Sequence, residues 1–423
     1  MITLSNRRLH STSVGDARNQ YARDRDRVIF SSAFRRLQDK TQVFPMARAD
    51  FVRTRLTHSI EVASVARSIL SEILAVANHK FWDQDHNQAI SELLEATCLA
   101  HDLGNPPFGH FGEEAIRQWF ILDGLKYLED LPEAQKQDFL RFEGNAQGLR
   151  TILKLANHEG LKLSADTIAA FVKYPWVSTI QPHPKKNKFG IFQSEIKDYR
   201  EVAKILDLKP IQADRWGRHP LVYIMEAADD LCYRLIDYQD GVRLKKIAFS
   251  EAQTLLSQFL GQKYQEKLIP EHELERNLAV VFGIFTQEIA QAFCDLMENP
   301  LAETESTPTG LMDKILWQNQ DYSRFFTTIA KESYEKCYSD RDVIKIELAG
   351  QKMISSLLSQ FVPAILNNQS GRGDYARILK LLPQRSESHH TYDKLQRVTD
   401  YICGMTDSFA CNLYQELGGL NLY

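Results

Sequence analysis

The feature that most constrains the fold is a helical period of apolar residues that recurs along nearly the whole chain. Between residues 57 and 77 apolar side chains recur every three or four positions, with Thr57 as a candidate N-cap. Similar stripes cover residues 88–101, 113–120, 143–157, 164–173, 219–240, 250–261, 270–297, 310–319, 322–337, 341–369, 373–382 and 391–418. Strand signals, such as alternating runs and hairpin dipeptides, are rare. The sequence therefore predicts an all-α protein with many short loops.

Only a few stretches interrupt this pattern. Residues 174–199 are rich in proline, lysine and aromatic residues and are predicted to be non-helical, and residues 300–309 are predicted to form an exposed loop. Both are typical of insertions on one helical body rather than linkers between independent domains. We therefore expect residues 1–423 to form a single body.

Composition excludes several classes of protein. The chain has 43% hydrophobic and 25% charged residues, as ordinary soluble proteins do, and its net charge of −4 gives no overall signal for nucleic acid. The six cysteines are scattered without a CxxC pair, which argues against disulfides and a thiolate zinc site. The N-terminus lacks the apolar core of a signal peptide, and no segment approaches the ~18 apolar residues of a membrane span. We expect a cytoplasmic protein with no membrane partner.

The chemically richest stretch is LAHDLGNPPFGHFGEE, residues Leu99–Glu114. His101 and Asp102 stand at the end of a helical run, where a Gly/Pro turn follows. Adjacent residues on a regular helix point about 100° apart, so both can bind one ion only near the helix end. The turn could bring His110 and Glu113 to the same cavity, although His110 alone is as readily a capping or core histidine.

Two other segments add to this motif. RTRLTHSIE places His58 at the start of a helix, and EAADDLCYRLID places Asp229 inside another. Two imidazoles and two carboxylates form a mixed nitrogen and oxygen ligand set that suits a divalent metal. For Asp229 the alternative is an ordinary solvated helix face.

The helix that carries Asp229 is well bracketed in the sequence. Pro220 suits its first position and Gly241 the position after its end. Asp229, Tyr233 and Asp237 follow at intervals of four residues and therefore share one face. Within an apolar helix such a row needs partners, because an unpaired buried charge is expensive, and a metal and a polar ligand would serve. Other histidines are expected on the surface, in loops or at caps: His79, His86, His158, His183, His219, His389 and His390.

Taken together, these motifs resemble the HD-domain superfamily, and specifically its bacterial deoxynucleoside triphosphate triphosphohydrolase (dGTPase-like) branch. The resemblance runs over most of the chain in eight ordered blocks. They are YARDRDRVIFSSAFRRLQDKTQVFP, RTRLTHSIEVA, HDLGNPPFGHFGEEAI, RFEGNAQGLR, AAFVKYPW, KFGIF, MEAADDLCYRLIDYQDG and VTDYICGMTDSFACNLY.

The resemblance implies a role for each matching residue. His58, His101, Asp102 and Asp229 match four metal ligands, and His110 with Glu113 matches a catalytic histidine–carboxylate pair. Gln42 and Asp237 match groups that bind the sugar 3′-hydroxyl, and Tyr233 matches a tyrosine beside the deoxyribose. Positions near the triphosphate are matched by Arg55, Asn145, Lys173 and Tyr174.

It also implies an architecture and a reaction. An HD core over about residues 50–245 would carry a C-terminal helical part, about residues 250–423, packed on it. The reaction would be hydrolysis of a deoxynucleoside triphosphate (dNTP) at the α-phosphorus to deoxynucleoside and triphosphate, within the phosphoric monoester hydrolase class. It implies one divalent ion (Mn²⁺, Mg²⁺, Fe²⁺, Ni²⁺ or Co²⁺), with additional Mg²⁺ on the triphosphate. It further implies homo-oligomers, often hexamers, and single-stranded DNA as a further partner of some members.

Two alternatives stay open at this point. One is an HD-type 5′-nucleotidase for deoxynucleoside monophosphates, which would lack the triphosphate-binding blocks. The other is a single-stranded-DNA-binding relative with weak catalysis, which the acidic net charge does not favour.

Overall fold

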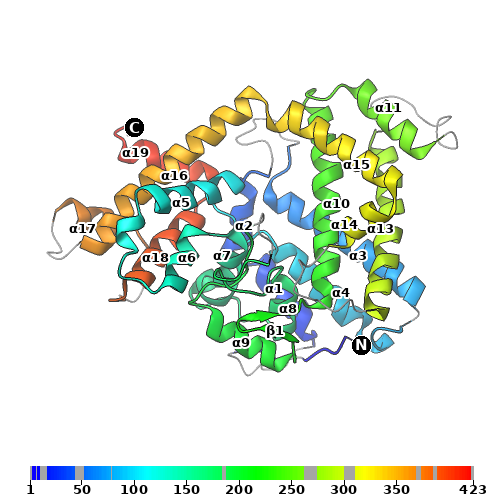
Figure 1. Cartoon of the computed structure of the whole chain (residues 1–423), viewed down its shortest axis with the longest axis horizontal. Coiled ribbons are helices and arrows are strands. Elements are labelled where there is room, and N and C mark those ends of the chain that lie inside the picture. Colours follow the sequence, from blue (N-terminus) through cyan, green and yellow to red (C-terminus); the bar gives the residue numbers. More distant parts are fainter. Residues whose placement is uncertain are drawn as a thin grey trace.

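The all-α prediction is confirmed by a computed structural model of the chain. The structure describes residues 2–5, 7–9, 17–42, 52–77, 79–182, 187–261, 274–299, 310–367, 373–383 and 388–420. Within these ranges the protein is built from helices, and the strands are two short antiparallel partners, β1 (Pro210–Gln212) and β2 (Arg215–Trp216) (Figure 1).

Helices follow one another along the described chain. The first half contains α1 (Gln20–Ile29), α2 (Ser32–Arg36), α3 (Arg55–Ala77), α4 (Asn87–Ala100), α5 (His110–Leu122), α6 (Glu133–Leu140), α7 (Gly144–Arg150), α8 (Ala165–Phe171) and α9 (Ile196–Ile205). The second half contains α10 (Pro220–Arg243), α11 (Phe249–Leu260), α13 (Leu274–Glu298), α14 (Leu311–Gln318), α15 (Gln320–Ser333), α16 (Arg341–Asn367), α17 (Asp374–Leu379), α18 (Thr391–Cys403) and α19 (Asp407–Leu417). Short 3₁₀ turns cover Leu37–Asp39, Gln84–His86, Leu125–Tyr127 and Ala156–His158, and π turns cover Thr151–Leu155 and Tyr334–Tyr338.

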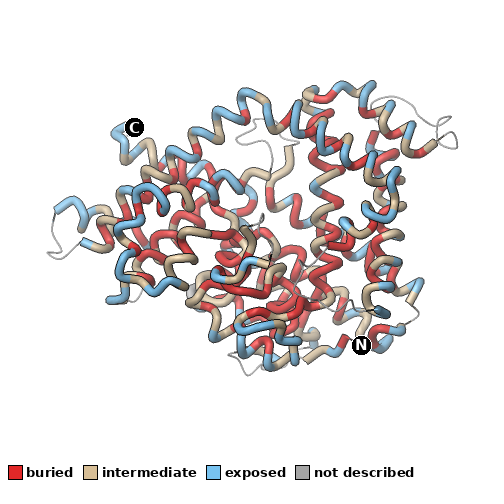
Figure 2. Tube along the Cα trace, in the orientation of Figure 1, coloured by how far each residue is buried: buried red, intermediate tan, exposed pale blue. Residues whose placement is uncertain are grey.

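These helices enclose two hydrophobic cores. The larger core lies among α1, α3, α4, α8, α10, α13, α14 and α15, and the second among α5, α6, α16, α18 and α19. The long helix α16 runs from the top middle of the view to the lobe on the left, where it packs on α5, α18 and α19 (Figure 1). Buried backbone fills the interior of both parts (Figure 2). The loop between α4 and α5 lies between the cores, because Leu103 belongs to the first and Phe108 to the second.

Several predicted helices are interrupted in the structure. The stripe over 391–418 is two helices, because Gly404 ends α18 and the Thr406 hydroxyl caps α19 by accepting from the Phe409 N–H. The stripe over 143–157 is the short α7, the π turn Thr151–Leu155 and then a 3₁₀ turn, in which Asn157 has a left-handed φ of 53°. The apolar period continues across both breaks, so the stripe alone does not reveal them.

Two predicted helix ends are also wrong. Helix α3 begins at Arg55, not after Thr57, because Thr54 and Thr57 exchange side-chain to backbone hydrogen bonds at its start. Helix α10 continues past Gly241 to Arg243. Gly241 is a point of close packing, since a Cβ there would lie 2.6 Å from the Cys337 sulfur. His219 is the N-cap of α10, one of the roles predicted for it, and accepts from the Leu221 N–H. All six cysteines are free and buried.

The predicted loop over residues 300–309 falls among the residues that the structure does not describe. The predicted non-helical stretch over 174–199 is confirmed up to the start of α9 at Ile196, except for residues 183–186, which are not described.

One described helix, α13, is long and apolar enough to cross a membrane by length and composition alone. The sequence prediction that no segment approaches such a length overlooked it. Its residues Val281, Phe285 and Ile289 are fully buried, and it packs on α3 and α10. It therefore takes the place of a core helix.

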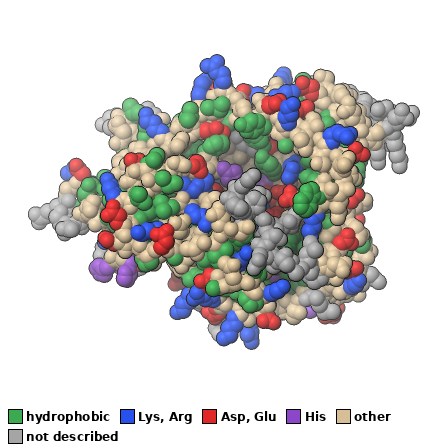
Figure 3. All heavy atoms as spheres, in the orientation of Figure 1, with side chains coloured by type: hydrophobic (Ala, Val, Ile, Leu, Met, Phe, Trp, Pro, Cys, Tyr) green, Lys and Arg blue, Asp and Glu red, His purple; other side chains and the backbone are tan. Residues whose placement is uncertain are grey.

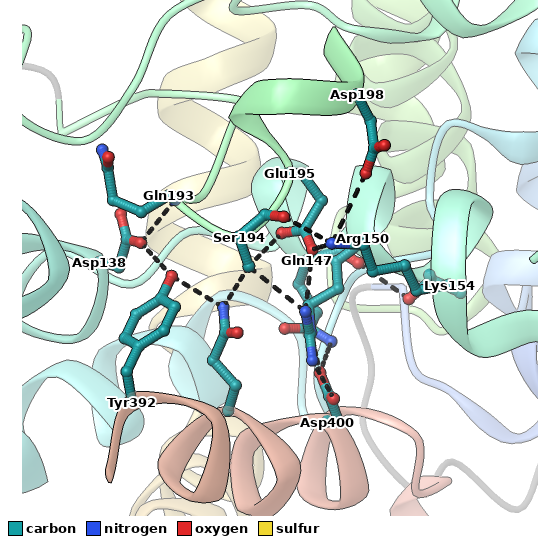
Figure 4. Close-up of polar contacts among 12 residues, drawn as sticks. Asp138, Gln147, Arg150, Lys154, Gln193, Ser194, Glu195, Asp198, Tyr392 and Asp400 are labelled. Atoms are coloured by element: carbon teal, nitrogen blue, oxygen red, sulfur yellow. Dashed lines mark hydrogen bonds and ion pairs between the residues drawn. The ribbon is translucent and has the colours of Figure 1, made fainter. Parts of the chain in front are cut away.

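A network of buried polar side chains, called here the α18 network, joins α18 to the preceding segments (Figure 4). Its members are Asp138, Gln147, Arg150, Lys154, Ser178, Gln193, Ser194, Glu195, Tyr392, Gln396 and Asp400. Arg150 grips Asp400 with two hydrogen bonds, from Nε to Oδ1 (2.7 Å) and from Nη2 to Oδ2 (2.9 Å), and donates a third to Glu195. Tyr392 reaches from α18 to the Asp138 carboxylate at 2.5 Å. The network fixes α18 against α6, α7 and the start of α9.

Candidate metal centre and active site

Three predicted metal ligands converge at the meeting point of α3, α4 and α10. One ligand atom from each of His58, His101 and Asp229 lies within 4.8 Å of the others. His58 stands in the first turn of α3, His101 directly after α4, and Asp229 in the middle of α10. Helix α3 packs on both α4 and α10, and this packing brings the three side chains together. The face of the molecule in Figure 3 is hollowed near its middle, and histidine surface is visible at that hollow.

Hydrogen bonds set the direction of each imidazole. The Nδ1 of His101 lies 2.7 Å from the Cys98 carbonyl, which can only accept, so Nδ1 carries the proton and Nε2 presents a lone pair. His101 Nε2 is buried and has no hydrogen-bond partner within the described structure. His58 Nε2 lies 3.1 Å from the Asp229 Oδ1, and the two imidazole rings meet edge to face.

Asp102, the fourth predicted ligand, stands beside this group of three. Its Oδ1 lies 3.7 Å from His101 Nε2 and is held by Arg55 Nη1 (2.9 Å) and Asn105 Nδ2 (2.5 Å). Its Oδ2 is buried and has no partner among the residues described.

This donor set fits a divalent cation. Buried polar atoms in proteins are nearly always hydrogen bonded, so the unpartnered His101 Nε2 and Asp102 Oδ2 require an explanation. Imidazole nitrogen and carboxylate oxygen, without thiolate, are ligands that first-row divalent metals accept. A cation bound among His58, His101 and Asp229 would give the His101 Nε2 a partner.

The surrounding charges keep the carboxylates ionised. Burial alone would raise the pKa of Asp229, but His101, His58 and nearby Lys173 hold it well below its usual range. Burial likewise opposes ionisation of Asp102, yet Arg55 and His101 lower its pKa. Burial works against protonation of His58, but its hydrogen bond with Asp229 raises the pKa. The centre is a compact set of opposite charges, in which His58 is buried and the side chain of Asp229 is 23% exposed.

The predicted histidine–carboxylate pair lies at the start of α5. His110 is the first residue of this helix and its side chain is 77% exposed, whereas Glu113 is buried one turn later. The Nδ1 of His110 lies 3.7 Å from the Glu113 Oε1. Burial opposes ionisation of Glu113, but His110 and two further cations, Lys188 and Arg117, lower its pKa to about 2. Glu113 is therefore a permanent anion behind an exposed imidazole.

Two glycines, Gly109 and Gly144, shape the backbone and the space around His110 and Glu113. Gly109, the residue before α5, has a left-handed φ of 58°, which a residue with a side chain rarely adopts. A Cβ on Gly144 would lie 2.5 Å from the Glu113 Oε1.

The predicted sugar-contacting residues lie further along α10. Asp237 is buried, and this burial raises its pKa to about 8. Tyr233 is 46% exposed, and its ring is parallel to that of Tyr338, with centroids 6.4 Å apart. The Tyr338 hydroxyl lies 3.2 Å from the Asp237 Oδ2. Tyr338, which follows α15, is a site residue that the sequence analysis missed, because a tyrosine at the end of a helical stripe carries no chemical signal.

Of the residues predicted near the triphosphate, Lys173 lies closest to the metal centre. Its Nζ lies 3.6 Å from both the Asp229 Oδ2 and the Glu226 Oε1. Burial alone would lower its pKa, but Tyr174 and the two carboxylates raise it well above its ordinary value. Tyr174 is the next residue, and its ring packs on Trp176.

The other predicted contacts lie around this group. Arg55 is only 5% exposed, and its Nη1 lies 2.9 Å from the Asp102 Oδ1, beside the candidate metal centre. Asn145 donates to the Glu143 Oε1 at 2.6 Å, on the side of the site where Lys188 also binds Glu143. Gln42 is half-buried, and its Oε1 is without a hydrogen-bond partner in the described part of the chain.

Comparison with known proteins agrees with this geometry. A sequence profile for the HD domain matches residues 55–208, and one for a phosphohydrolase-associated domain matches residues 328–416. The first stretch carries His58, His101 and Asp102 as well as His110 and Glu113, which defines a protein of the HD class.

Relatives extend the similarity over nearly the full length. A deoxyguanosinetriphosphate triphosphohydrolase-like protein of Pseudomonas aeruginosa is 36% identical over 421 residues, covering 95% of this chain and 94% of the relative. One from Synechocystis is also 36% identical, over 96% of this chain and 95% of its own. A deoxyguanosinetriphosphate triphosphohydrolase of Salmonella arizonae is 30% identical over 93% of this chain and 92% of the relative. The chain belongs to the deoxyguanosinetriphosphate triphosphohydrolase-like family of HD-domain proteins.

Proposed function

We propose that this protein hydrolyses deoxynucleoside triphosphates at the α-phosphorus, releasing the deoxynucleoside and intact inorganic triphosphate. The observation that carries the proposal is the convergence of His58, His101 and Asp229 around a buried imidazole nitrogen that has no partner among the described residues. The names of the relatives, which describe triphosphohydrolases, supply the substrate class.

The proposed metal ligands are His58, His101, Asp102 and Asp229. A divalent ion of Mn, Mg, Fe, Ni or Co bound there would supply a Lewis acid that withdraws charge from the phosphoryl group and lowers the pKa of water. Arg55 and Asn105 would hold Asp102 in place for this task, and the Cys98 carbonyl would hold His101. Additional Mg²⁺ would accompany the triphosphate.

His110 is proposed as the general acid. When water adds to the α-phosphorus, the bond to the 5′-oxygen breaks, and this oxygen is a poor leaving group unless it receives a proton. The exposed imidazole of His110 can reach a bound nucleotide, and the ionised carboxylate of Glu113 lies behind it. Proton donation from a positioned histidine is typically worth ~10²–10⁴-fold in rate.

The remaining residues are proposed to hold the nucleotide. Lys173 places a positive charge next to Asp229, where the phosphates would approach. Asp237, supported by Tyr338, and Gln42 would bind the sugar 3′-hydroxyl, and the exposed ring of Tyr233 would pack beside the deoxyribose. Asn145 and Tyr174 would contact the triphosphate.

The wider setting of the protein is also part of the proposal. We propose one catalytic body over residues 1–423, with an HD core over about 50–245 and the C-terminal helices, about 250–423, packed on it. We propose a cytoplasmic homo-oligomer, of which a hexamer is one form, acting on free dNTPs without a membrane partner. Single-stranded DNA remains a proposed regulator.

Product analysis tests the reaction. The purified protein is incubated with each dNTP, singly and mixed, with Mn²⁺ or Mg²⁺, and the products are separated by ion exchange. Deoxynucleoside and intact triphosphate are expected from wild type and from His389→Ala, an exposed-histidine control, but not from His101→Ala. Release of nucleoside and phosphate from deoxynucleoside monophosphates alone would replace the proposal with the nucleotidase reaction.

A further inference from the structure

The loop between α4 and α5, residues 101–110, joins the two halves of the proposed active site. It begins with His101 and Asp102 at the metal centre and ends with His110. Two consecutive residues near its end, Phe108 and Gly109, have left-handed φ angles of 62° and 58°. A bulky residue such as phenylalanine rarely adopts this conformation, and it persists only where its surroundings enforce it. The contacts of Phe108 therefore decide where His110 points.

The strongest of these contacts comes from the far end of the chain. Asp407, the first residue of α19, accepts the Phe108 N–H on its Oδ1 at 2.9 Å. Its Oδ2 accepts both the backbone N–H (2.9 Å) and the hydroxyl (2.5 Å) of Thr41, the residue before Gln42. Asp407 is only 2% exposed, so these hydrogen bonds form away from water. One carboxylate thus holds two segments of the proposed active site.

Asp407 does not serve its own helix. An aspartate at a helix start commonly bonds to the free N–H groups of that helix. Here the Thr406 hydroxyl takes this role by accepting from Phe409, and both oxygens of Asp407 are directed to Thr41 and Phe108. Asp407 therefore differs from an ordinary capping residue, because its hydrogen bonds go to other segments of the chain.

Two neighbours strengthen the same attachment. Lys40 is 5% exposed, and its Nζ donates to the Asn105 carbonyl (2.5 Å) and to the Cys403 carbonyl (2.6 Å). The ring of Phe108 lies on Gly350 of α16, where a Cβ would come within 2.7 Å of it. The loop is therefore fastened at both Asn105 and Phe108 to the C-terminal helices.

We infer that Asp407 is a positioning residue for the proposed reaction, which it serves by fixing the Phe108 peptide and thereby the aim of His110, and by holding the segment that carries Gln42. The inference rests on the proposed function for the identity of the reaction, but not for the attachment of the loop. It gives the C-terminal helices a direct part in the geometry of the site.

Asp407→Asn tests this inference, because an amide nitrogen cannot accept the hydrogen bonds that one carboxylate oxygen accepts. We expect kcat for the dNTP to fall ~10–100-fold, the usual scale for a group that supports catalytic residues. The metal content should remain within about threefold of wild type, since Asp407 lies outside the proposed ligand set. Hydrogen exchange should accelerate at the amides of residues 101–113.

Asp138→Asn is the matched control. Asp138 is equally buried at 1% and also accepts three hydrogen bonds, from Ser178, Tyr392 and the Gln193 N–H, but it belongs to the α18 network. We expect this variant to lower the melting temperature without changing kcat or the exchange of residues 101–113. An equal loss of kcat in both variants would attribute the effect to general destabilisation and overturn the inference.

Asp407→Glu provides a second route if the asparagine variant does not fold. The glutamate keeps the charge but moves the carboxylate by one methylene, so kcat should fall while the fold is retained. Wild-type kcat and unchanged exchange in a folded Asp407 variant would contradict the inference. If the wild-type protein hydrolyses no dNTP, the proposed function fails, and the exchange measurement alone still decides whether Asp407 holds the loop.

Discussion

The molecule buries two clusters of charged side chains that differ in how completely they are paired. In the α18 network both oxygens of Asp400, both of Glu195 and all three nitrogens of Arg150 have partners, and the unpartnered atoms are amide oxygens of Gln147 and Gln396. In the candidate metal centre the atoms without a partner in the described structure are His101 Nε2, Asp102 Oδ2 and the Nε of the neighbouring Arg55, and the first two are of the kinds that bind metal ions.

This difference in pairing distinguishes a cluster that stabilises the fold, the α18 network, from one that is suited to bind a ligand, the candidate metal centre. A buried network whose charged atoms all have partners holds elements together and needs no ligand to satisfy them. Each buried polar atom left without a partner costs about 1–3 kcal/mol, a cost that a bound ligand would remove. The comparison predicts that substitutions in the two clusters have opposite signatures in activity and stability.

The largest effect is expected from His101→Ala. It removes the imidazole whose Nε2 is unpartnered in the described structure, so metal retention and dNTP hydrolysis should be lost together. Metal content by mass spectrometry and turnover of each dNTP measure this, with His389→Ala as the control. Full activity with metal retained would remove the distinction between the two clusters.

His110→Ala should lower kcat by ~10²–10⁴-fold, the range of general acid catalysis, while metal and nucleotide binding are kept. The side chain is exposed and lies 3.7 Å from Glu113, so its removal leaves the packing unchanged. Steady-state kinetics and metal analysis check this prediction. Glu114→Gln, which changes an exposed carboxylate next to Glu113, is the control, and unchanged turnover in His110→Ala would make His110 a structural residue.

Asp400→Asn should show the opposite signature. Removing one partner of a buried ion pair leaves Arg150 incompletely paired and should cost about 3 kcal/mol of unfolding free energy. Metal content and kcat should stay within twofold of wild type at a temperature where both proteins are folded. Denaturant unfolding and turnover measured on the same samples decide this, and a selective loss of kcat would assign catalysis to the α18 network.

Stability of the α18 network should also depend on pH through Asp138. Burial raises the pKa of its carboxyl to about 7, against ~4 in the unfolded chain. Between these values the folded state holds a proton that the unfolded state has lost, so this contribution to stability falls as pH rises and is flat above about 7. The deficit in melting temperature of Asp138→Asn should therefore shrink from pH 5 to pH 7.5. A deficit that grows over this range would contradict a raised pKa for the Asp138 carboxyl in the folded state.

The smallest effect is expected from Tyr338→Phe. It removes the hydroxyl 3.2 Å from the Asp237 carboxylate and keeps the ring beside Tyr233. Loss of one such hydrogen bond is worth about 1 kcal/mol, so KM for the dNTP should rise about fivefold with kcat unchanged. Tyr334→Phe, which changes an exposed tyrosine on the same turn, should have no effect on either constant.

The sequence predicted those parts of the protein in which neighbouring residues carry the information. Apolar stripes predicted the long helices, and HDLGNPPFGH with its companion motifs indicated residues that the structure brings together at His58, His101 and Asp229. Helix α1 was missed because its stripe is masked by charges, one of which, Asp24, is fully buried and paired with Arg8.

The remainder depends on contacts between distant segments. Asp407 and Phe108 are 299 residues apart, and nothing in either neighbourhood shows that one holds the other. Tyr338 reaches Asp237 across the junction of α15 and α10. The breaks at Gly404 and after Arg150 lie inside continuous apolar stripes, where capping and a π turn override the period.

Hydrolysis of a dNTP in water enriched with ¹⁸O tests the central claim most directly. Attack at the α-phosphorus, with departure of the 5′-oxygen, places one ¹⁸O atom in the released triphosphate and none in the deoxynucleoside, and mass spectrometry of the two products separates these cases. The proposed reaction predicts that pattern for wild type and no product above background for His101→Ala. Label in the deoxynucleoside, or release of pyrophosphate and a monophosphate instead, would contradict it.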